Sequence, residues 1–152
     1  MDETSIRVQG AWKYLYRAVD KHGKTIDFLL TEHRDEQAAK TFLTQAIRRH
    51  GGVPETITID GRAANEAAIK TYNEDHGTAI VIRKPKYLKN IVEQDHRGIT
   101  RVTRPMLGFK AFDAAQATFT GIELMHMLRK GQLEGGREQG RSAAEQFYAL
   151  AA

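Results

Sequence analysis

The chain of 152 residues contains no cysteine. A disulfide framework, a zinc site built on thiolates and a cysteine nucleophile are therefore excluded. The six histidines are scattered and never stand three or four residues apart, so one helical face cannot offer two imidazoles to zinc. Carboxylates remain as the metal ligands that this sequence can supply.

Long hydrophobic runs are also absent. No apolar stretch approaches the roughly 20 residues that span a bilayer, and the first residues lack the basic and then apolar pattern of a signal peptide. We therefore expect a soluble protein that is not exported and has no membrane partner. The content of 41% hydrophobic and 28% charged residues is typical of a globular chain, and the length fits one core.

The positive charge is concentrated in one part of the chain. Between Arg83 and Lys110 stand eight basic and two acidic residues, a net charge of +6, whereas the whole chain carries +4. The remainder is thus acidic, at −2. A basic block of this kind points to a polyanion such as nucleic acid. On charge alone, a solvated helix face explains the block equally well.

The first half of the chain predicts strands and helices in the order βββαβαβ. Alternating apolar residues and β-branched or aromatic content indicate the strands, and an acidic start with a glycine stop indicates the helices. The expected strands are Ser5–Val8, Trp12–Asp20, Thr25–Thr31, Glu55–Asp60 and Thr78–Arg83, and the expected helices are Asp35–Arg49 and Ala63–His76.

The second half predicts helices. One runs from about Tyr87 to Val102 and stops at Pro105, with an apolar face of Leu88, Ile91, Val92, Ile99 and Val102. The next begins at Asp113, with Gln116 as its capping-box partner, and continues to Lys130. We expect residues 1–131 to form the domain and residues 132–152 to form a flexible linker and a short helix capped by Ser142 and Glu145.

Three acids stand where metal chemistry can use them. Asp2 lies at the first expected strand, Asp60 ends the fourth, and Glu93 lies on the basic helix. Two magnesium ions about 3.5–4 Å apart, held by carboxylates, can promote phosphodiester displacement. Because the first and fourth strands are expected to be neighbours, the carboxylates of Asp2 and Asp60 can share one metal ion.

Several strings carry a resemblance to a known family. They are Asp2-Glu3-Thr4, the segment from Trp12 to Asp20, Lys86-Tyr87-Leu88, the segment from Ile91 to Arg97, and the segment from Arg104 to Lys110. Over about residues 1–132 the chain resembles DDE transposases of the sixth bacterial insertion-sequence family. The resemblance implies an α/β fold with an RNase H-like, retroviral-integrase-like core and a mixed five-stranded sheet in the order βββαβαβ, followed by helices.

The family resemblance also implies a function for individual residues. Asp2, Asp60 and Glu93 would be the three DDE acids, binding two Mg²⁺ ions, for which Mn²⁺ can substitute, to cut the transposon end and join its 3′-hydroxyl to target DNA. A homo-oligomer and a bacterial, cytoplasmic, nucleoid-associated location follow from the same resemblance. The residues assigned to DNA contact are Lys86, Lys89, Arg97 and Arg101, with His96 as an additional candidate for the site.

Each of these candidate site features also has an ordinary structural interpretation. Asp60-Gly61 alone fits a strand-to-helix turn, Glu93 with Arg97 fits an ion pair on a helix surface, and His96 fits a packed helix histidine. The helix-turn-helix region that precedes the catalytic domain in this family is not among the 152 residues. The alternative function is therefore a truncated, non-catalytic remnant that acts as a DNA-binding or oligomerisation module.

Overall fold

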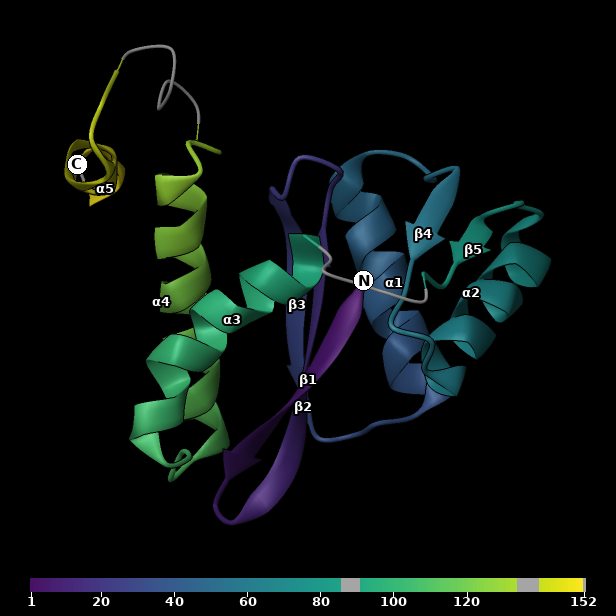
Figure 1. Ribbon diagram of the computed structural model, residues 1–152, viewed down its shortest axis with the longest axis horizontal. Helices are drawn as coiled ribbons and strands as arrows, with labels where there is room; N and C mark the ends of the chain where they lie inside the picture. The colour runs from purple at the N-terminus through teal and green to yellow at the C-terminus, as the bar shows by residue number, and fades with distance from the viewer. Residues whose placement is uncertain (86–90, 134–139, 152) are drawn as a thin grey trace.

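The computed structural model describes residues 1–85, 91–133 and 140–151, and the side chains of all of these except 91–96 and 151. Figure 1 shows the first three strands at the centre, with helices on both sides and the two remaining short strands beside the helices at the right. The elements are β1 (Asp2–Val8), β2 (Ala11–Val19), β3 (Thr25–Thr31), α1 (Glu36–His50), β4 (Thr56–Thr58), α2 (Ala63–His76), β5 (Val81–Arg83), α3 (Ile91–Thr103), the 3₁₀ turn η1 (Arg104–Met106), α4 (Phe112–Arg129) and α5 (Ala143–Ala151).

The first three strands form an antiparallel meander, as the alternation predicts. Gln9 and Gly10 make the connection between β1 and β2 with φ values of 51° and 77°, the left-handed conformation that two-residue hairpin turns require. The register pairs Asp2 with Arg17 and Val8 with Ala11. This pairing places the start of β1 beside the second half of β2.

Local signals set the ends of the two helices that follow. The Asp35 carboxylate caps α1 by accepting the Ala38 backbone N–H at 2.8 Å. Gly51 and Gly77 end α1 and α2 in the left-handed conformation, with φ of 84° and 62°. The sequence predictions of both helices are thus confirmed.

The prediction of a single five-stranded sheet is not confirmed. β1, β2 and β3 form one sheet, and β4 and β5 form a separate parallel pair in which Thr56 faces Val81. The Met1 nitrogen donates to the Thr58 carbonyl oxygen at 2.9 Å, so the edges of β1 and β4 meet. β4 has three residues, and this one hydrogen bond does not extend into a ladder.

Two apolar clusters cover opposite faces of the meander (Figure 1). On one face α1 and α2 pack over Tyr16, with Phe42 and Ile69 completely buried between them. On the other face α3 and α4 pack over Leu15, with Ile99 and Phe119 completely buried. The alternation of Leu15 and Tyr16 thus sends one side chain to each layer.

Helix α3 and the loop after it differ in part from the prediction. The described helix begins at Ile91, and residues 87–90 of the predicted helix lie outside the described residues. Ile99 is buried as expected, but Val102, one turn further on, is 45% exposed. Pro105 falls inside η1.

The loop after η1 is fixed to the far end of β1. The Phe109 backbone N–H donates to the Arg7 carbonyl at 2.8 Å, and the Gln9 N–H donates to the Phe109 carbonyl at 2.7 Å. Gly108 has a φ of 112°, and a Cβ there would lie 3.0 Å from the Arg7 oxygen. Glycine is thus required for this close approach.

The capping box predicted at Asp113 is wrong. α4 begins at Phe112 behind Ala111, which makes no side-chain cap, so Asp113 lies inside the first turn. The box predicted for the last helix is confirmed: the Ser142 N–H donates to the Glu145 carboxylate at 2.7 Å, and the Glu145 N–H donates to the Ser142 hydroxyl at 3.3 Å. Among the described residues, no helix is long and apolar enough to cross a bilayer.

Candidate active site

Asp60 follows β4 and stands at the entrance to α2. Its Oδ1 accepts the Arg62 backbone N–H at 3.2 Å and the Asn65 side-chain amide at 3.3 Å, while its Oδ2 accepts Arg62 Nε at 2.6 Å. Burial raises the pKa of Asp60, and the charge and hydrogen bond of neighbouring Asp2 raise it further, against the hydrogen bonds from Arg62 and Asn65. The Asp2 carboxyl group therefore lies close enough to Asp60 to act on its pKa.

Asp2 reaches this position through β1. The contact between the Met1 nitrogen and the Thr58 carbonyl holds the start of β1 against the end of β4, two residues before Asp60. Burial lowers the pKa of the Met1 amino group to about 6, and the carboxylates of Asp2 and Asp60 both oppose this shift. Asp2, Asp60 and the Met1 nitrogen thus lie close together where β1 meets β4.

The third predicted acid lies on α3, and its side chain is outside the described residues, as is that of His96. α3 contacts β1, and Figure 1 shows the first turn of the helix near the end of β1 that carries Asp2. Among the described side chains, no group of three or more acids and histidines is placed to hold a metal ion.

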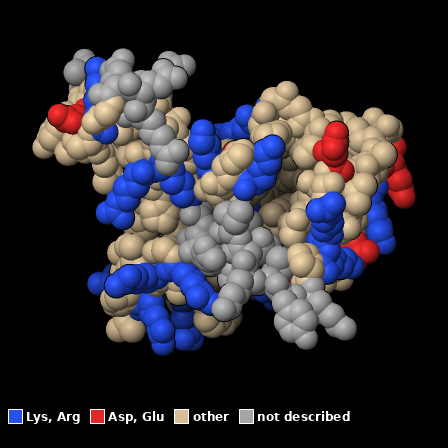
Figure 2. Space-filling model, turned by 45° about the horizontal axis from the view of Figure 1, so that its top comes forward, with Lys and Arg blue, Asp and Glu red and all other residues tan. Residues whose placement is uncertain are grey.

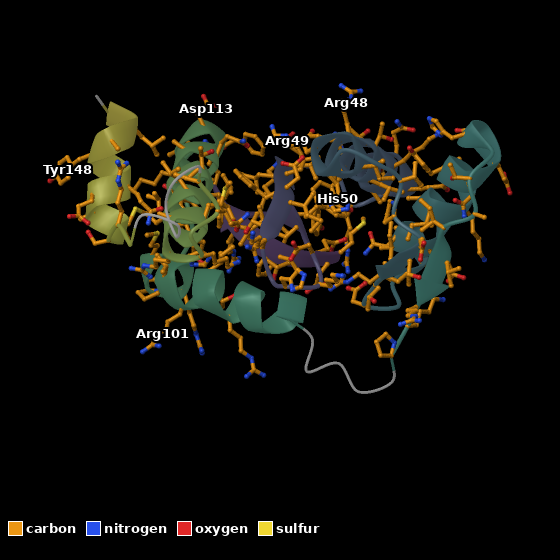
Figure 3. All side chains as sticks on the ribbon, turned by 90° about the horizontal axis from the view of Figure 1, so that it is seen from above. Arg48, Arg49, His50, Arg101, Asp113 and Tyr148 are labelled. Atoms are coloured by element: carbon orange, nitrogen blue, oxygen red, sulfur yellow. The ribbon has the colours of Figure 1, made fainter. Side chains whose placement is uncertain are left out.

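The predicted DNA-contacting residues are described in part. Lys86 and Lys89 lie outside the described residues. Arg97 and Arg101 are exposed on α3, one helical turn apart. Figure 2 shows a face with Lys and Arg gathered in its lower left, where α3 lies, and with fewer Asp and Glu side chains. Arg101 projects away from the body on the side opposite Arg48 of α1 (Figure 3).

Beside the two acids lies a third carboxylate, that of Glu3, which the sequence pattern did not single out and which has cations of its own. The Glu3 side chain is 1% exposed; its Oε1 forms an ion pair with Arg34 Nε at 2.8 Å and accepts a hydrogen bond from Arg62 Nη1 at 3.2 Å. Burial and the neighbouring Glu3 carboxylate raise the pKa of Tyr16, its partner on β2, well above the usual range. One guanidinium, that of Arg62, therefore contacts both Glu3 and Asp60.

A second missed feature lies behind Asp2. Its partner on β2, Arg17, makes two hydrogen bonds to the Glu123 carboxylate of α4, and the Thr25 hydroxyl contacts the same carboxylate at 3.4 Å. A charged residue in the middle of an apolar strand is the signal that could have found Arg17, since a buried guanidinium requires an acid. Nothing in the local pattern indicates that the acid is Glu123.

This arrangement, with two neighbouring acids at strand ends and a basic helix beside them, defines a candidate site for phosphodiester chemistry with oxygen-ligated metal ions. Comparison with known proteins shows to which class of protein the chain belongs. The family described as a DDE domain matches residues 1–132. The chain belongs to the DDE transposases of the insertion-sequence type represented by that family, as the resemblance in the sequence implies.

Curated relatives agree with the family. The transposase for insertion sequence-like element IS431mec of Staphylococcus aureus is 36% identical over 137 residues, covering 86% of this chain and 57% of the relative. The transposase for insertion sequence element IS257 in transposon Tn4003 of the same species matches to the same extent. The chain thus spans little more than half the length of these curated relatives.

Two other matches are shorter or more distant. The uncharacterized protein pYV0051 of Yersinia pseudotuberculosis is 42% identical over 71 residues, covering 45% of this chain and 66% of that protein. A chain in the cryo-EM structure of the simian T-cell lymphotropic virus intasome in complex with PP2A regulatory subunit B56 gamma has a TM-score of 0.49 and 16% identity, over 69% of this chain and 38% of its own. That likeness is too remote to bear on the assignment.

Proposed function

We propose that the chain is the catalytic domain of a transposase, which cuts the ends of an insertion sequence and transfers the resulting 3′-hydroxyl to target DNA. The observation that carries the proposal is the contact between Met1 and Thr58, which brings the start of β1, with Asp2, beside the end of β4, with Asp60, inside the matched DDE domain. We assign Glu93, on the helix that contacts β1, as the third acid of the site.

The donors at this place suit Mg²⁺. Carboxylate oxygens are the ligands that this ion prefers, and the chain has no thiolate that would favour a softer metal. Two neighbouring carboxylates, one of them with a raised pKa, carry a repulsion that a divalent cation relieves. When bound, two Mg²⁺ ions, or Mn²⁺ in their place, would activate the attacking oxygen and stabilise the leaving oxygen.

The residues of the chain hold the metal ions and position the DNA. Asp2, Asp60 and Glu93 supply the ligand oxygens. Arg97 and Arg101 contact the phosphates of transposon-end or target DNA, and such contacts fix the position of the DNA without reading its sequence. We assign the same phosphate-contacting role to Lys86 and Lys89, and an additional place near the site to His96.

The wider assignments belong to the same proposal. Residues 1–131 form the catalytic domain, and residues 132–152 form a linker and the short helix α5. The transposase acts as a homo-oligomer in the bacterial cytoplasm, on the nucleoid. The exposed apolar side chains of α5 support association with other chains, because such patches commonly mark interaction sites; they are Phe147, Tyr148 and Leu150.

Cleavage of supercoiled plasmid by the full chain tests the function. We expect nicking in Mg²⁺ or Mn²⁺ but not in EDTA, and its loss in Asp60→Asn and Glu93→Gln. Asp113→Asn is the matched control, because Asp113 is an exposed acid on α4 away from the site (Figure 3). If the unchanged chain binds DNA in a salt-dependent manner but never nicks it, the non-catalytic DNA-binding module is the better description.

A further inference from the structure

The position of Arg62 between two acids is the strongest unassigned feature of the molecule. Its Nε donates to Asp60 Oδ2 at 2.6 Å, and its Nη1 contacts Glu3 Oε1 at 3.2 Å. The two contacts use different nitrogens of one planar fork, so the guanidinium can keep one acid while it releases the other. Arg62 is the residue that precedes the first turn of α2, which fixes its backbone beside both acids.

The two acids differ in how strongly they need this cation. The Glu3 carboxylate is 1% exposed and cannot rely on water, whereas the Asp60 side chain is 23% exposed. A buried carboxylate without a partner is costly. Arg34 also contacts Glu3, so the two acids differ in access: Asp60, whose side chain is the more exposed, is the acid at which another cation can replace the guanidinium, while Arg62 keeps its contact with Glu3.

A metal ion at Asp60 would share a carboxylate that Arg62 already contacts. Oδ2 accepts Arg62 Nε at 2.6 Å, and Oδ1 accepts both the Arg62 backbone N–H and the Asn65 amide, so Oδ2 is the oxygen with a lone pair left for a metal ion. A divalent cation and a guanidinium on one carboxylate also repel each other. Metal binding at Oδ2 therefore competes with the side-chain contact of Arg62 on Asp60.

We propose that Arg62 is a built-in counter-ion of the second acid, which competes with the divalent metal for Asp60 and keeps only its contact with Glu3 when the metal binds. The inference rests on the proposed function, because it assumes that Asp60 is a metal ligand. Arg62 and Glu3 are then positioning residues, which set how readily the site takes up metal. Arg34, which contacts the same Glu3 oxygen, stays in place during the exchange.

The test is the affinity of the full chain for Mn²⁺, measured by the loss of the free-ion paramagnetic resonance signal. Arg62→Gln removes the competitor, so we expect affinity to rise roughly three- to tenfold, the range for loss of one charge-assisted hydrogen bond at a partly exposed site. Arg34→Gln is the matched control: it removes an equal charge from Glu3 but none from Asp60, and we expect a change of less than about twofold.

The variant Glu3→Gln provides a second test of the proposal by the same measurement of Mn²⁺ affinity. With Glu3 neutral, Arg62 has only Asp60 to pair with, so Mn²⁺ affinity falls about as much as it rises in Arg62→Gln. In the double variant Glu3→Gln/Arg62→Gln, the effect of the Glu3 change disappears, because there is no guanidinium left to compete with the metal. If instead the change at Glu3 lowers affinity equally in both backgrounds, it acts through its charge alone and the exchange does not occur.

Other outcomes of these affinity measurements would also reject the counter-ion role of Arg62. Equal gains in Arg62→Gln and Arg34→Gln, or a loss of affinity in Arg62→Gln, would overturn the proposal even if Glu3→Gln fails to fold. Asp60→Asn separates this inference from the function on which it rests. Loss of Mn²⁺ binding in Asp60→Asn without a gain in Arg62→Gln rejects the counter-ion role alone, whereas unchanged binding in Asp60→Asn rejects the metal site and the role together.

Discussion

The guanidinium of Arg17 and the carboxylate of Glu123 are joined by two hydrogen bonds of 2.6 and 3.0 Å, with the side chains 0% and 1% exposed. The pair ties β2 to α4 beneath the strand that carries Asp2. Removal of one member leaves an uncompensated charge in the interior, which costs about 3–5 kcal/mol. We therefore predict that Glu123→Gln lowers the free energy of unfolding by about this amount, measured by urea denaturation.

The control is a surface pair. Lys13 and Glu32 form an ion pair on the same sheet, but Glu32 is 54% exposed. Glu32→Gln should therefore change the denaturation midpoint far less than Glu123→Gln does. Equal effects of the two substitutions would show that burial of the Arg17–Glu123 pair does not make it more important to the fold.

DNA binding is predicted to depend on one face of the molecule. Arg101 projects from α3, whereas Arg48 projects from α1 on the opposite side (Figure 3). Arg101→Gln should weaken binding to DNA of any sequence and reduce the slope of log affinity against log salt by about 1, as loss of one phosphate contact does. Fluorescence anisotropy over a series of salt concentrations measures both quantities.

Arg48→Gln is the matched charge-neutralising control for this prediction. It should leave affinity and salt slope almost unchanged, apart from the small effect of net charge. If the two variants weaken DNA binding to the same degree, the basic side of α3 is not the DNA-binding face, and binding reflects the charge of the whole chain.

Gln132, the first residue of the proposed linker, is predicted to attach the linker to β3 and so to stabilise the end of the domain. Its side-chain oxygen accepts the Thr25 N–H at 2.9 Å and its side-chain nitrogen donates to the Thr25 carbonyl at 2.9 Å. Gln132→Ala removes both hydrogen bonds and should lower the free energy of unfolding by about 1–3 kcal/mol. Gln37→Ala, at an exposed position of α1, is the control. If Gln132→Ala leaves the free energy of unfolding unchanged, the stabilised domain ends at α4.

The features that sequence reasoning found are those with local signals. Asp35, Gly51 and Gly77 mark helix ends through contacts within a few residues, so their patterns are readable along the chain. Asp2 and Asp60 are expected to lie close together because strand order constrains which strand ends are neighbours, and the Met1–Thr58 hydrogen bond brings the start of β1 to the end of β4.

The features that sequence reasoning missed depend on contacts between distant parts of the chain. Arg62 reaches Glu3 across 59 positions, and Arg17 reaches Glu123 across 106. No local periodicity encodes such pairings, because many acids in the sequence could serve as partner. The predicted five-stranded sheet would also need a contact between distant parts of the chain, the pairing of β1 with β4. One hydrogen bond from Met1 is described there.

The most direct test of the account is a Mn²⁺ titration of the full chain, followed by calorimetry, beside the variants Asp60→Asn, Glu93→Gln and Asp113→Asn. The account predicts saturable binding that is lost or strongly weakened in the first two variants and retained in the third, because Asp60 and Glu93 supply ligand oxygens and Asp113 does not. Binding that persists in Asp60→Asn and Glu93→Gln, or no saturable binding by the unchanged chain, would contradict the assignment of a carboxylate metal site to these residues.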